Sequence, residues 1–208
     1  MDPDLALLER WRAGDLSAGG DLFRRHMPDV LRFFEHKAGT KAEDLTQQTF
    51  LDCVKALHQF RGHSSFRTYL FAIARNALFR YLRRESNREA IDFEGTSIAE
   101  LGAAMTSPSS RLERARQGQR LHTALALLPV EQQLLLEYHY WYELDAAALG
   151  EIFQVPAGTI RVRLLRARNA LRKRLEEAAP GDSAPDDPIT RSLIASKPED
   201  EAADRIER

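Results

Sequence analysis

The sequence predicts an all-α protein of two small helical domains, joined by a flexible linker and followed by a disordered acidic tail. Wherever the sequence is periodic, apolar residues recur three and four positions apart, as on one face of an α-helix. No segment alternates apolar and polar residues as a half-buried strand does. The periodicity is lost twice, over 87–112 and again after Pro180. We therefore expect domains at 1–86 and 113–179, a linker at 87–112 and a tail at 180–208.

Capping residues divide these domains into helices. Ser17 suits the N-cap of a helix, because its hydroxyl can accept a hydrogen bond from a free backbone N–H. Gly14 and Gly39 each stand where a helical pattern ends, a position that favours glycine. The expected helices span residues 4–13, 18–37, 42–59 and 65–85 in the first domain, and 113–128, 130–141, 146–153 and 157–178 in the second.

The composition favours a cytoplasmic protein without catalytic groups. Of the 208 residues 43% are hydrophobic, yet no run approaches the ~18–20 apolar residues of a membrane span, so no membrane insertion is expected. The acidic N-terminus lacks the pattern of a secretory signal. Cys53 is the single cysteine, which excludes an internal disulfide and a zinc ribbon. With no glycine-rich phosphate loop, His/Cys cluster or Ser/His/Asp spacing, we expect no enzyme, cofactor or metal.

The net charge of −1 conceals a polarised molecule. Residues 61–90 hold seven Arg and two Glu, and residues 157–175 hold seven basic residues and no acid. Residues 176–208 hold ten acids and four bases. The two basic blocks are candidate anion-binding surfaces.

A helix-turn-helix is predicted in the second domain. Asp145 can cap the helix over 146–153, and the turn Gln154–Val155 leads to Pro156. Proline suits the first turn of the following helix, since its missing N–H would be unpaired there. Two helices joined by so short a turn are typical of this motif.

The helix expected at 157–178 has two contrasting faces. The core stripe consists of Ile160, Leu164, Ala167, Leu171 and Leu175, and the outward face consists of Arg161, Val162, Leu165, Arg166, Asn169 and Arg172. The outward face carries arginine and no carboxylate, whereas a solvated helix usually mixes both signs. It suits a DNA backbone, and arginine can also reach guanine edges. A merely solubilising surface is the alternative.

Two further surfaces lie in the first domain. In the helix at 65–85, one stripe holds Tyr69, Ala72, Asn76, Phe79, Arg80 and Arg83, a mixture that suits unstacked bases. The spacing allows equally that Tyr69 and Phe79 are core residues and that Asn76 is an ordinary surface residue. In the helix at 42–59, we expect Phe50, Cys53, Val54 and Leu57 in the core, and Asp44, Gln47, Gln48, Leu51 and Lys55 on the other side. An exposed leucine ringed by polar groups is typical of a protein contact, although single exposed leucines are common.

Two blocks of the sequence resemble the extracytoplasmic-function sigma factors of the sigma-70 family. Region two of that family is similar to AEDLTQQTFLDCVKALHQFRGHSSFRTYLFAIARNALFRYLRRE. Region four is similar to LPVEQQLLLEYHYWYELDAAALGEIFQVPAGTIRVRLLRARNALRKRL. The resemblance covers roughly residues 17–86 and 113–176, with both blocks in the family's order. It implies a region two helical bundle and a region four helix-turn-helix.

The resemblance implies a sigma factor that binds core RNA polymerase, directs it to promoter DNA and helps to melt the duplex. Contacts with the clamp helices of the polymerase beta-prime subunit are expected from Asp44, Gln47, Gln48 and Leu51, and the beta subunit is a further expected partner. Contacts with the minus-ten element are expected from Arg61, His63, Ser64, Tyr69, Asn76, Arg80 and Arg83. Contacts with the minus-thirty-five element are expected from Thr159, Arg161, Val162, Arg163, Leu165 and Arg166. An anti-sigma protein is the remaining expected partner.

The chain departs from the family pattern at four positions. Gln48 stands where glutamate is common, which removes a charge at the expected polymerase contact, and Val54 replaces a tryptophan. Gln154 occupies the usual glycine of the turn, where a left-handed backbone would add a strain of ~1 kcal/mol. Val162 replaces a small polar residue and favours contact with a thymine methyl group.

Two other functions are compatible with parts of the sequence. A stand-alone regulator that binds duplex operators as a dimer would share the helix-turn-helix, but would not need the aromatic stripe of the helix at 65–85. An enzyme or RNA-binding module fused to a helix-turn-helix is the second. Co-elution with core polymerase and run-off transcription would separate the first rival from a sigma factor.

Overall fold

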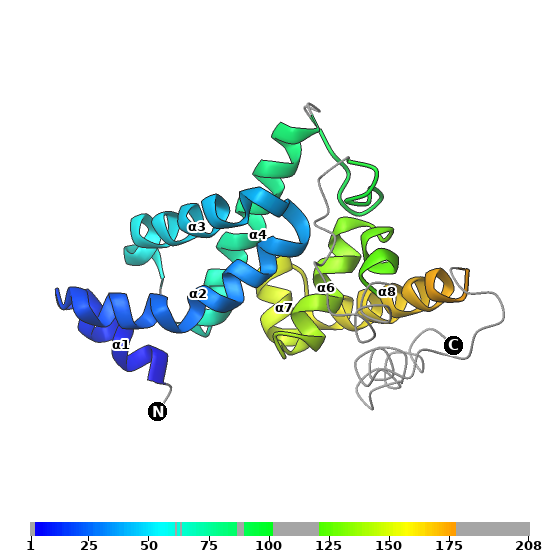
Figure 1. Ribbon diagram of the computed structural model, residues 1–208. Coiled ribbons are helices and arrows are strands. Elements are labelled where there is room, and N and C mark those ends of the chain that lie inside the picture. The colour runs from blue at the N-terminus through cyan, green and yellow to red at the C-terminus, as the bar shows by residue number, and fades with distance from the viewer. Residues whose placement is uncertain (1–2, 61, 63, 87–89, 102–120, 178–208) are drawn as a thin grey trace, which may run out of the picture. The chain divides into compact units, whose positions relative to one another are not determined.

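The computed structural model describes residues 3–60, 62, 64–86, 90–101 and 121–177. Helix is the only regular secondary structure in these residues, which confirms the all-α prediction. The chain divides into two compact units, one holding the residues up to Arg84 and the other most of the residues from Glu85 onward (Figure 1). None of the described helices is both long and apolar enough to cross a membrane. The predicted tail at 180–208 lies outside the described residues.

The described part of the first unit consists of α1 (Pro3–Arg12), α2 (Leu16–Ala38), η1 (Gly39–Lys41), α3 (Ala42–Ala56), η2 (Leu57–Gln59) and α4 (Phe66–Glu85). The long helix α2 packs against both α1 and α3 (Figure 1). Its side chains Leu22 and Phe33 are fully buried, and the Phe33 ring meets Phe71 of α4 edge-on with the centroids 6.0 Å apart. Burial of these apolar side chains holds α4 against α2.

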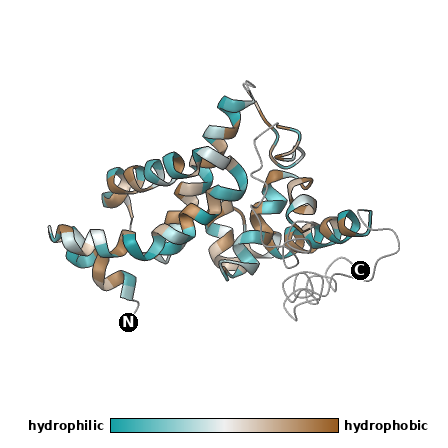
Figure 2. Ribbon diagram, viewed as in Figure 1, coloured by the Kyte–Doolittle hydropathy of each residue, from teal (hydrophilic) through white to brown (hydrophobic). Residues whose placement is uncertain are grey.

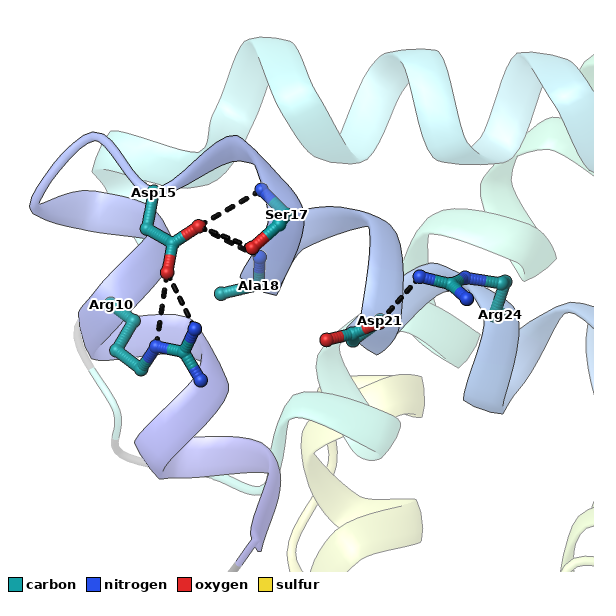
Figure 3. A network of polar contacts seen from close by, with 6 residues as sticks. All are labelled: Arg10, Asp15, Ser17, Ala18, Asp21 and Arg24. Atoms are coloured by element: carbon teal, nitrogen blue, oxygen red, sulfur yellow. Dashed lines mark hydrogen bonds and ion pairs between the residues drawn. The ribbon is translucent and has the colours of Figure 1, made fainter.

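Asp15, rather than the predicted Ser17, caps the N-terminus of α2 (Figure 3). Its Oδ1 accepts hydrogen bonds from the backbone N–H groups of Ser17 at 3.0 Å and Ala18 at 3.3 Å. Oδ1 also accepts from the Ser17 hydroxyl at 2.6 Å, and Oδ2 accepts from Arg10 Nε at 3.0 Å. The Ser17 hydroxyl first, and then Arg10, lower the pKa of Asp15 to about 2. A carboxylate can accept all of these donors together, so the helix begins at Leu16.

The described part of the second unit contains a helical segment at 121–126, the helices α6 (Val130–Tyr140) and α8 (Ala157–Glu177), and α7 (Ala146–Phe153) as far as Gly150. α6 packs against α8. The predicted core stripe of α8 is confirmed, because Ile160, Leu164, Ala167, Leu171 and Leu175 are all buried. Figure 2 shows hydrophobic and hydrophilic residues interspersed along α8, as expected of a helix with one face in a core.

A tight turn joins α7 to α8 and completes the predicted helix-turn-helix. Asp145 caps α7, its Oδ1 accepting from the Ala148 N–H at 2.8 Å. Gln154 ends α7 in the left-handed region, with φ 58° and ψ 42°, where a non-glycine residue is strained by ~1 kcal/mol. A Cβ at Gly150 would stand 2.8 Å from the Val155 carbonyl oxygen, so this close approach requires glycine.

Part of the predicted linker belongs to the second unit instead. Within residues 92–101, which we call the strap, the side chains of Phe93, Ile98 and Leu101 are buried. The Val130 N–H donates to the Thr96 carbonyl oxygen at 2.9 Å, and the Glu131 N–H donates to that of Phe93 at 3.1 Å. The strap is therefore tied to the start of α6 by both backbone hydrogen bonds and apolar burial. Residues 87–89 and 102–112 of the predicted linker lie outside the described residues.

Candidate functional site

The outward face of α8 is cationic. Arg161 and Arg166 are exposed, as is Thr159 at the start of the helix, while Val162 and Leu165 between them are half-buried. The buried stripe fixes this orientation, because Ile160 and Leu164 turn the intervening side chains away from the core. No carboxylate occurs in α8 before Glu176. This face can hold phosphate groups and present guanidinium groups to base edges.

Arg163 is placed differently from the other arginines of α8. Its Nη1 lies 3.2 Å from Oε2 of Glu131 on α6, and its Nη2 lies 3.0 Å from Oε1 of Glu94 on the strap. The Arg163 side chain is only 28% exposed. It was predicted to contact the minus-thirty-five element, and the structure shows its guanidinium held between two carboxylates of its own unit.

A cleft of about 300 Å³ lies beside this ion pair. On the α8 side it is lined by Thr159, Val162, Arg163 and Arg166, and across from them by Glu94 and Glu131. Four of the predicted minus-thirty-five contacts thus share one cleft with two acids that the sequence reasoning missed. No periodic signal could have found Glu94, which lies 69 residues from Arg163 and meets it only through tertiary folding.

The residues predicted to meet the minus-ten element are only partly brought together. Asn76 and Arg83 are exposed on α4, and Ser64 is half-buried just before it. Arg80 is also exposed, but its Nη2 lies 2.5 Å from Oδ2 of Asp52 on α3. The remaining two predicted residues, Arg61 and His63, lie outside the described part of the chain.

Tyr69 is half-buried, and its side chain contacts residues that precede α4 in the sequence. Its hydroxyl donates to the carbonyl oxygen of Ala56 at 3.0 Å, and its ring lies 4.7 Å from that of Phe60, centroid to centroid. Burial raises the pKa of Tyr69 above its ordinary value. Phe79 is buried as well. Phe79 thus follows the alternative that the spacing had left open, in which it is a core residue. Tyr69 packs on Phe60 with part of its surface accessible, and its role as a base contact stays a prediction.

On α3, the predicted polymerase-contact residues lie on the outer side of the helix. Gln47 and Leu51 are exposed, and Asp44 pairs with Lys41 at 3.4 Å. The Gln48 side-chain amide donates to Oδ1 of Asp52 at 2.7 Å. Val54 was predicted to be in the core, but 46% of it is exposed. The buried side of α3 is instead formed by Thr46, Thr49, Phe50 and Cys53.

Val54 and Leu51 belong to an apolar groove of about 530 Å³ between α2 and α3. The groove is lined by Phe23, Met27, Leu31, Glu43, Thr46, Gln47, Phe50, Leu51 and Val54. The three α2 residues were missed, although their spacing of four is the sequence signal of a second apolar stripe on that helix. Such a groove suits the apolar side of a partner helix.

Among the described residues, no three His, Cys, Asp or Glu side chains gather where they could hold a metal ion. Cys53 is buried, and burial raises the pKa of its thiol to about 12, so it remains protonated at neutral pH. The described part of the chain thus offers charged and apolar binding surfaces.

Comparison with known families gives two matches. The Sigma-70 region 2 family matches residues 22–88, and the Sigma-70, region 4 family matches residues 118–171. Together these matches cover more than half of the chain. The first contains the groove and α4, and the second contains α6, α7 and most of α8.

Three similar proteins align with this chain over nearly their whole length. The RNA polymerase sigma-H factor of Pseudomonas aeruginosa is 29% identical over 85% of this chain and 95% of its own. The ECF RNA polymerase sigma-E factor of Escherichia coli is 26% identical over 83% of this chain and 94% of its own. RNA polymerase sigma factor YlaC of Bacillus subtilis is 29% identical, over 76% and 92%.

Two solved structures share the fold. CnrH, solved in complex with the cytosolic domain of CnrY, has a TM-score of 0.62 at 22% identity and covers 86% of this chain and 100% of its own. The sigma factor RpoE of Bartonella quintana, solved in complex with the anti-sigma factor NepR, has a TM-score of 0.53 at 24% identity, over 72% and 91%.

Proposed function

We propose that the surfaces described above have separate binding roles in transcription initiation, because the chain belongs to the sigma-70 family as a sigma factor of the extracytoplasmic-function type. The protein directs RNA polymerase to promoters. Sigma factors are initiation factors that catalyse no reaction themselves, and the proposal assigns binding roles alone to this chain. Its place of action is the cytoplasm, where polymerase and promoter meet.

The proposal is carried by the outward face of α8. Arg161 and Arg166 are exposed there opposite a buried apolar stripe, on the second helix of a helix-turn-helix. A helix in this position of the motif enters the major groove of duplex DNA. We therefore assign the minus-thirty-five element to Thr159, Arg161, Val162, Leu165 and Arg166.

The minus-ten element is assigned to the exposed part of the first unit around α4. Asn76 presents both a donor and an acceptor, which suits a base edge, and Arg83 adds positive charge for phosphate. Ser64, with Arg61 and His63 beside it in the sequence, completes the assignment. Arg80 contributes its charge while remaining paired with Asp52.

Core polymerase is assigned to the groove between α2 and α3 and its rim. Leu51 is 55% exposed and Met27 46% exposed, so a partner that covers them removes apolar surface from water. Asp44, Gln47 and Gln48 supply a polar rim, as at other protein interfaces. The proposed occupants are the clamp helices of the beta-prime subunit, with the beta subunit as a second contact. An anti-sigma protein, of the kind that NepR is for RpoE, would act by covering the same surface.

Run-off transcription with purified core polymerase tests this function. The wild-type chain should co-elute with core polymerase and support a promoter-specific transcript, whereas Leu51→Asp should lose both, because it places a charge in an apolar contact. Leu16→Asp is the matched control, since Leu16 is 79% exposed on the same unit but does not line the groove. Tight binding to a duplex operator without polymerase, and no transcript with it, would favour the stand-alone regulator instead.

A further inference from the structure

We propose that Glu94 competes with DNA phosphate for Arg163, so that the strap lowers the affinity of α8 for promoter DNA until it is displaced. The proposal rests on the proposed function, because it takes α8 to be the helix that binds duplex DNA. Its starting point is an exposed acidic side chain that lines a cleft whose other wall carries predicted DNA contacts.

The strap backbone fixes the position of Glu94. The Asp92 carbonyl oxygen accepts from the N–H groups of Gly95 at 3.2 Å and Thr96 at 2.9 Å, which closes a tight turn. The Asp92 side chain caps the same turn, its Oδ1 accepting from the Glu94 N–H at 3.0 Å. Phe93 anchors the turn, since its side chain is buried and its carbonyl oxygen accepts a hydrogen bond from the Glu131 N–H of α6. Glu94 therefore reaches Arg163 from a preorganised position.

The two carboxylates around Arg163 differ in exposure. The Glu131 side chain is 12% exposed, so its pair with Arg163 is shielded from solvent. The Glu94 side chain is 64% exposed, and an ion pair so open to water contributes little stability. An incoming phosphate can therefore replace Glu94 at Nη2 while Glu131 keeps Nη1 in place. Arg163 is then a phosphate contact that is already oriented by α6.

Glu94 also opposes DNA through its own charge. It lines the same cleft as Val162 and Arg166, so its carboxylate lies beside the surface that the phosphates approach. When a phosphate replaces Glu94 at Arg163, the DNA releases a condensed cation, but the freed Glu94 carboxylate attracts a cation in turn. The displacement therefore weakens binding and reduces its dependence on salt at the same time. A residue that only braced the strap would produce neither effect.

The test is Glu94→Gln, which keeps the size of the side chain and removes its charge. Binding of the full-length chain to a labelled minus-thirty-five duplex is measured by fluorescence anisotropy across a salt series starting at about 50 mM. We expect about two- to fivefold tighter binding at the lowest salt, the size set by an exposed ion pair. The slope of log K against log salt should become steeper by up to about one, since no cation is taken up.

Glu176→Gln is the matched control. It makes the same charge change on an exposed residue of the same unit, about 20 Å along α8 from Arg163. It should tighten binding less than Glu94→Gln does and leave the slope unchanged. Thermal unfolding of Glu94→Gln should match the wild type, and a lowered midpoint with unchanged DNA binding would assign Glu94 a bracing role and overturn the proposal.

Arg161→Ala separates the failure of this proposal from the failure of the proposed function. If Arg161→Ala weakens binding and Glu94→Gln leaves it unchanged, α8 binds DNA but Glu94 does not compete. If neither variant changes binding, both the competition and the assignment of α8 to duplex DNA are wrong.

Discussion

Asp15 couples the end of α1 to the start of α2. One carboxylate oxygen satisfies backbone N–H groups in the first turn of α2, and the other holds Arg10 in the last turn of α1 (Figure 3). Both interactions are strongest when the carboxylate is ionised, since charged acceptors form the stronger hydrogen bonds. The lowered pKa of Asp15 shows that folding favours the ionised carboxylate over the protonated carboxyl, so the ionised form stabilises the folded chain.

This coupling predicts a pH dependence that one substitution removes. The pKa of folded Asp15 is about 2, below its ordinary value of 3.8, so its contribution is fully present above pH ~4 and is lost as the pH falls through 2. Asp15→Asn keeps a capping oxygen and loses the charge. It should therefore be less stable than the wild type at pH 5 and approach it near pH 2, as measured by urea unfolding followed by circular dichroism. Asp21→Asn is the control outside the cap. It removes a carboxylate that forms an exposed ion pair with Arg24, and it should lower the stability at pH 5 less than Asp15→Asn does.

Gln48 shows why a departure from the family pattern is tolerated. Its amide donates to Asp52, whose other oxygen is paired with Arg80 on α4. A glutamate at this position would place a second carboxylate against Asp52 and could not donate to it. The glutamine therefore removes a charge at the proposed polymerase contact and completes a chain of polar contacts, from Gln48 through Asp52 to Arg80, that connects α3 to α4.

At the scale of the element, α8 predicts a base-specific effect of Arg161. Arg161 is exposed near the N-terminal end of the recognition helix, the part that meets base edges in this motif. If its guanidinium bonds to a guanine, Arg161→Ala should cost ~1–3 kcal/mol of holoenzyme binding, concentrated at one or two positions of the minus-thirty-five element. Binding to a panel of duplexes, each with one base pair changed, measures this.

The control for Arg161→Ala is Lys173→Ala on the same helix. Lys173 is 78% exposed near the C-terminal end of α8 and pairs only loosely with Glu177, at 3.9 Å. Its loss should affect all duplexes alike. A loss equally uniform for Arg161→Ala, with a shallower salt slope, would show that Arg161 contacts phosphate alone.

The buried face of a helix could be predicted from the sequence where one apolar stripe stands alone, but not where further apolar residues border that stripe. The core stripe of α8 follows from a single period, because only one side of that helix meets a core. α3 packs on α2 through Phe50 and leaves Val54 exposed beside the groove, and no period in α3 alone decides which apolar residue α2 covers. The ambiguity at Tyr69 has the same origin, since its partner Phe60 lies outside the helix that carries it.

At the scale of the whole molecule, the strap lay beyond sequence reasoning because nothing in it is periodic. Its order comes from partners far along the chain, such as the bonds from Val130 and Glu131 to its carbonyl oxygens. Glycine, serine and threonine over this stretch indicate a linker. An irregular segment that is anchored by a few buried side chains has the same composition, so the sequence does not separate the two. The exposure of Asn76 and Arg161 could be predicted from the helical period, whereas the acid that opposes Arg163 could not.

The strap acts on α8 only while it stays on the second unit. The hydrogen bonds from Val130 and Glu131 hold it there, together with the buried side chains of Phe93, Ile98 and Leu101. While these contacts persist, Glu94 stays beside Arg163. Under the competition proposed above, a strap that cannot leave should therefore keep the binding of α8 to the minus-thirty-five element weak.

A reversible lock on the strap tests this expectation. Ser97 and Pro129 form an isolated antiparallel bridge, which places their Cβ atoms near the separation that a disulfide needs. With Ser97→Cys and Pro129→Cys combined and oxidised, the chain should still bind core polymerase through the first unit, but should bind the minus-thirty-five duplex more weakly than the reduced double variant does. Reduction should restore the binding, and each single variant should behave alike with and without oxidant. Equal binding by the oxidised and reduced double variant would mean that the strap stays on the second unit when α8 binds DNA, and that it does not limit the affinity.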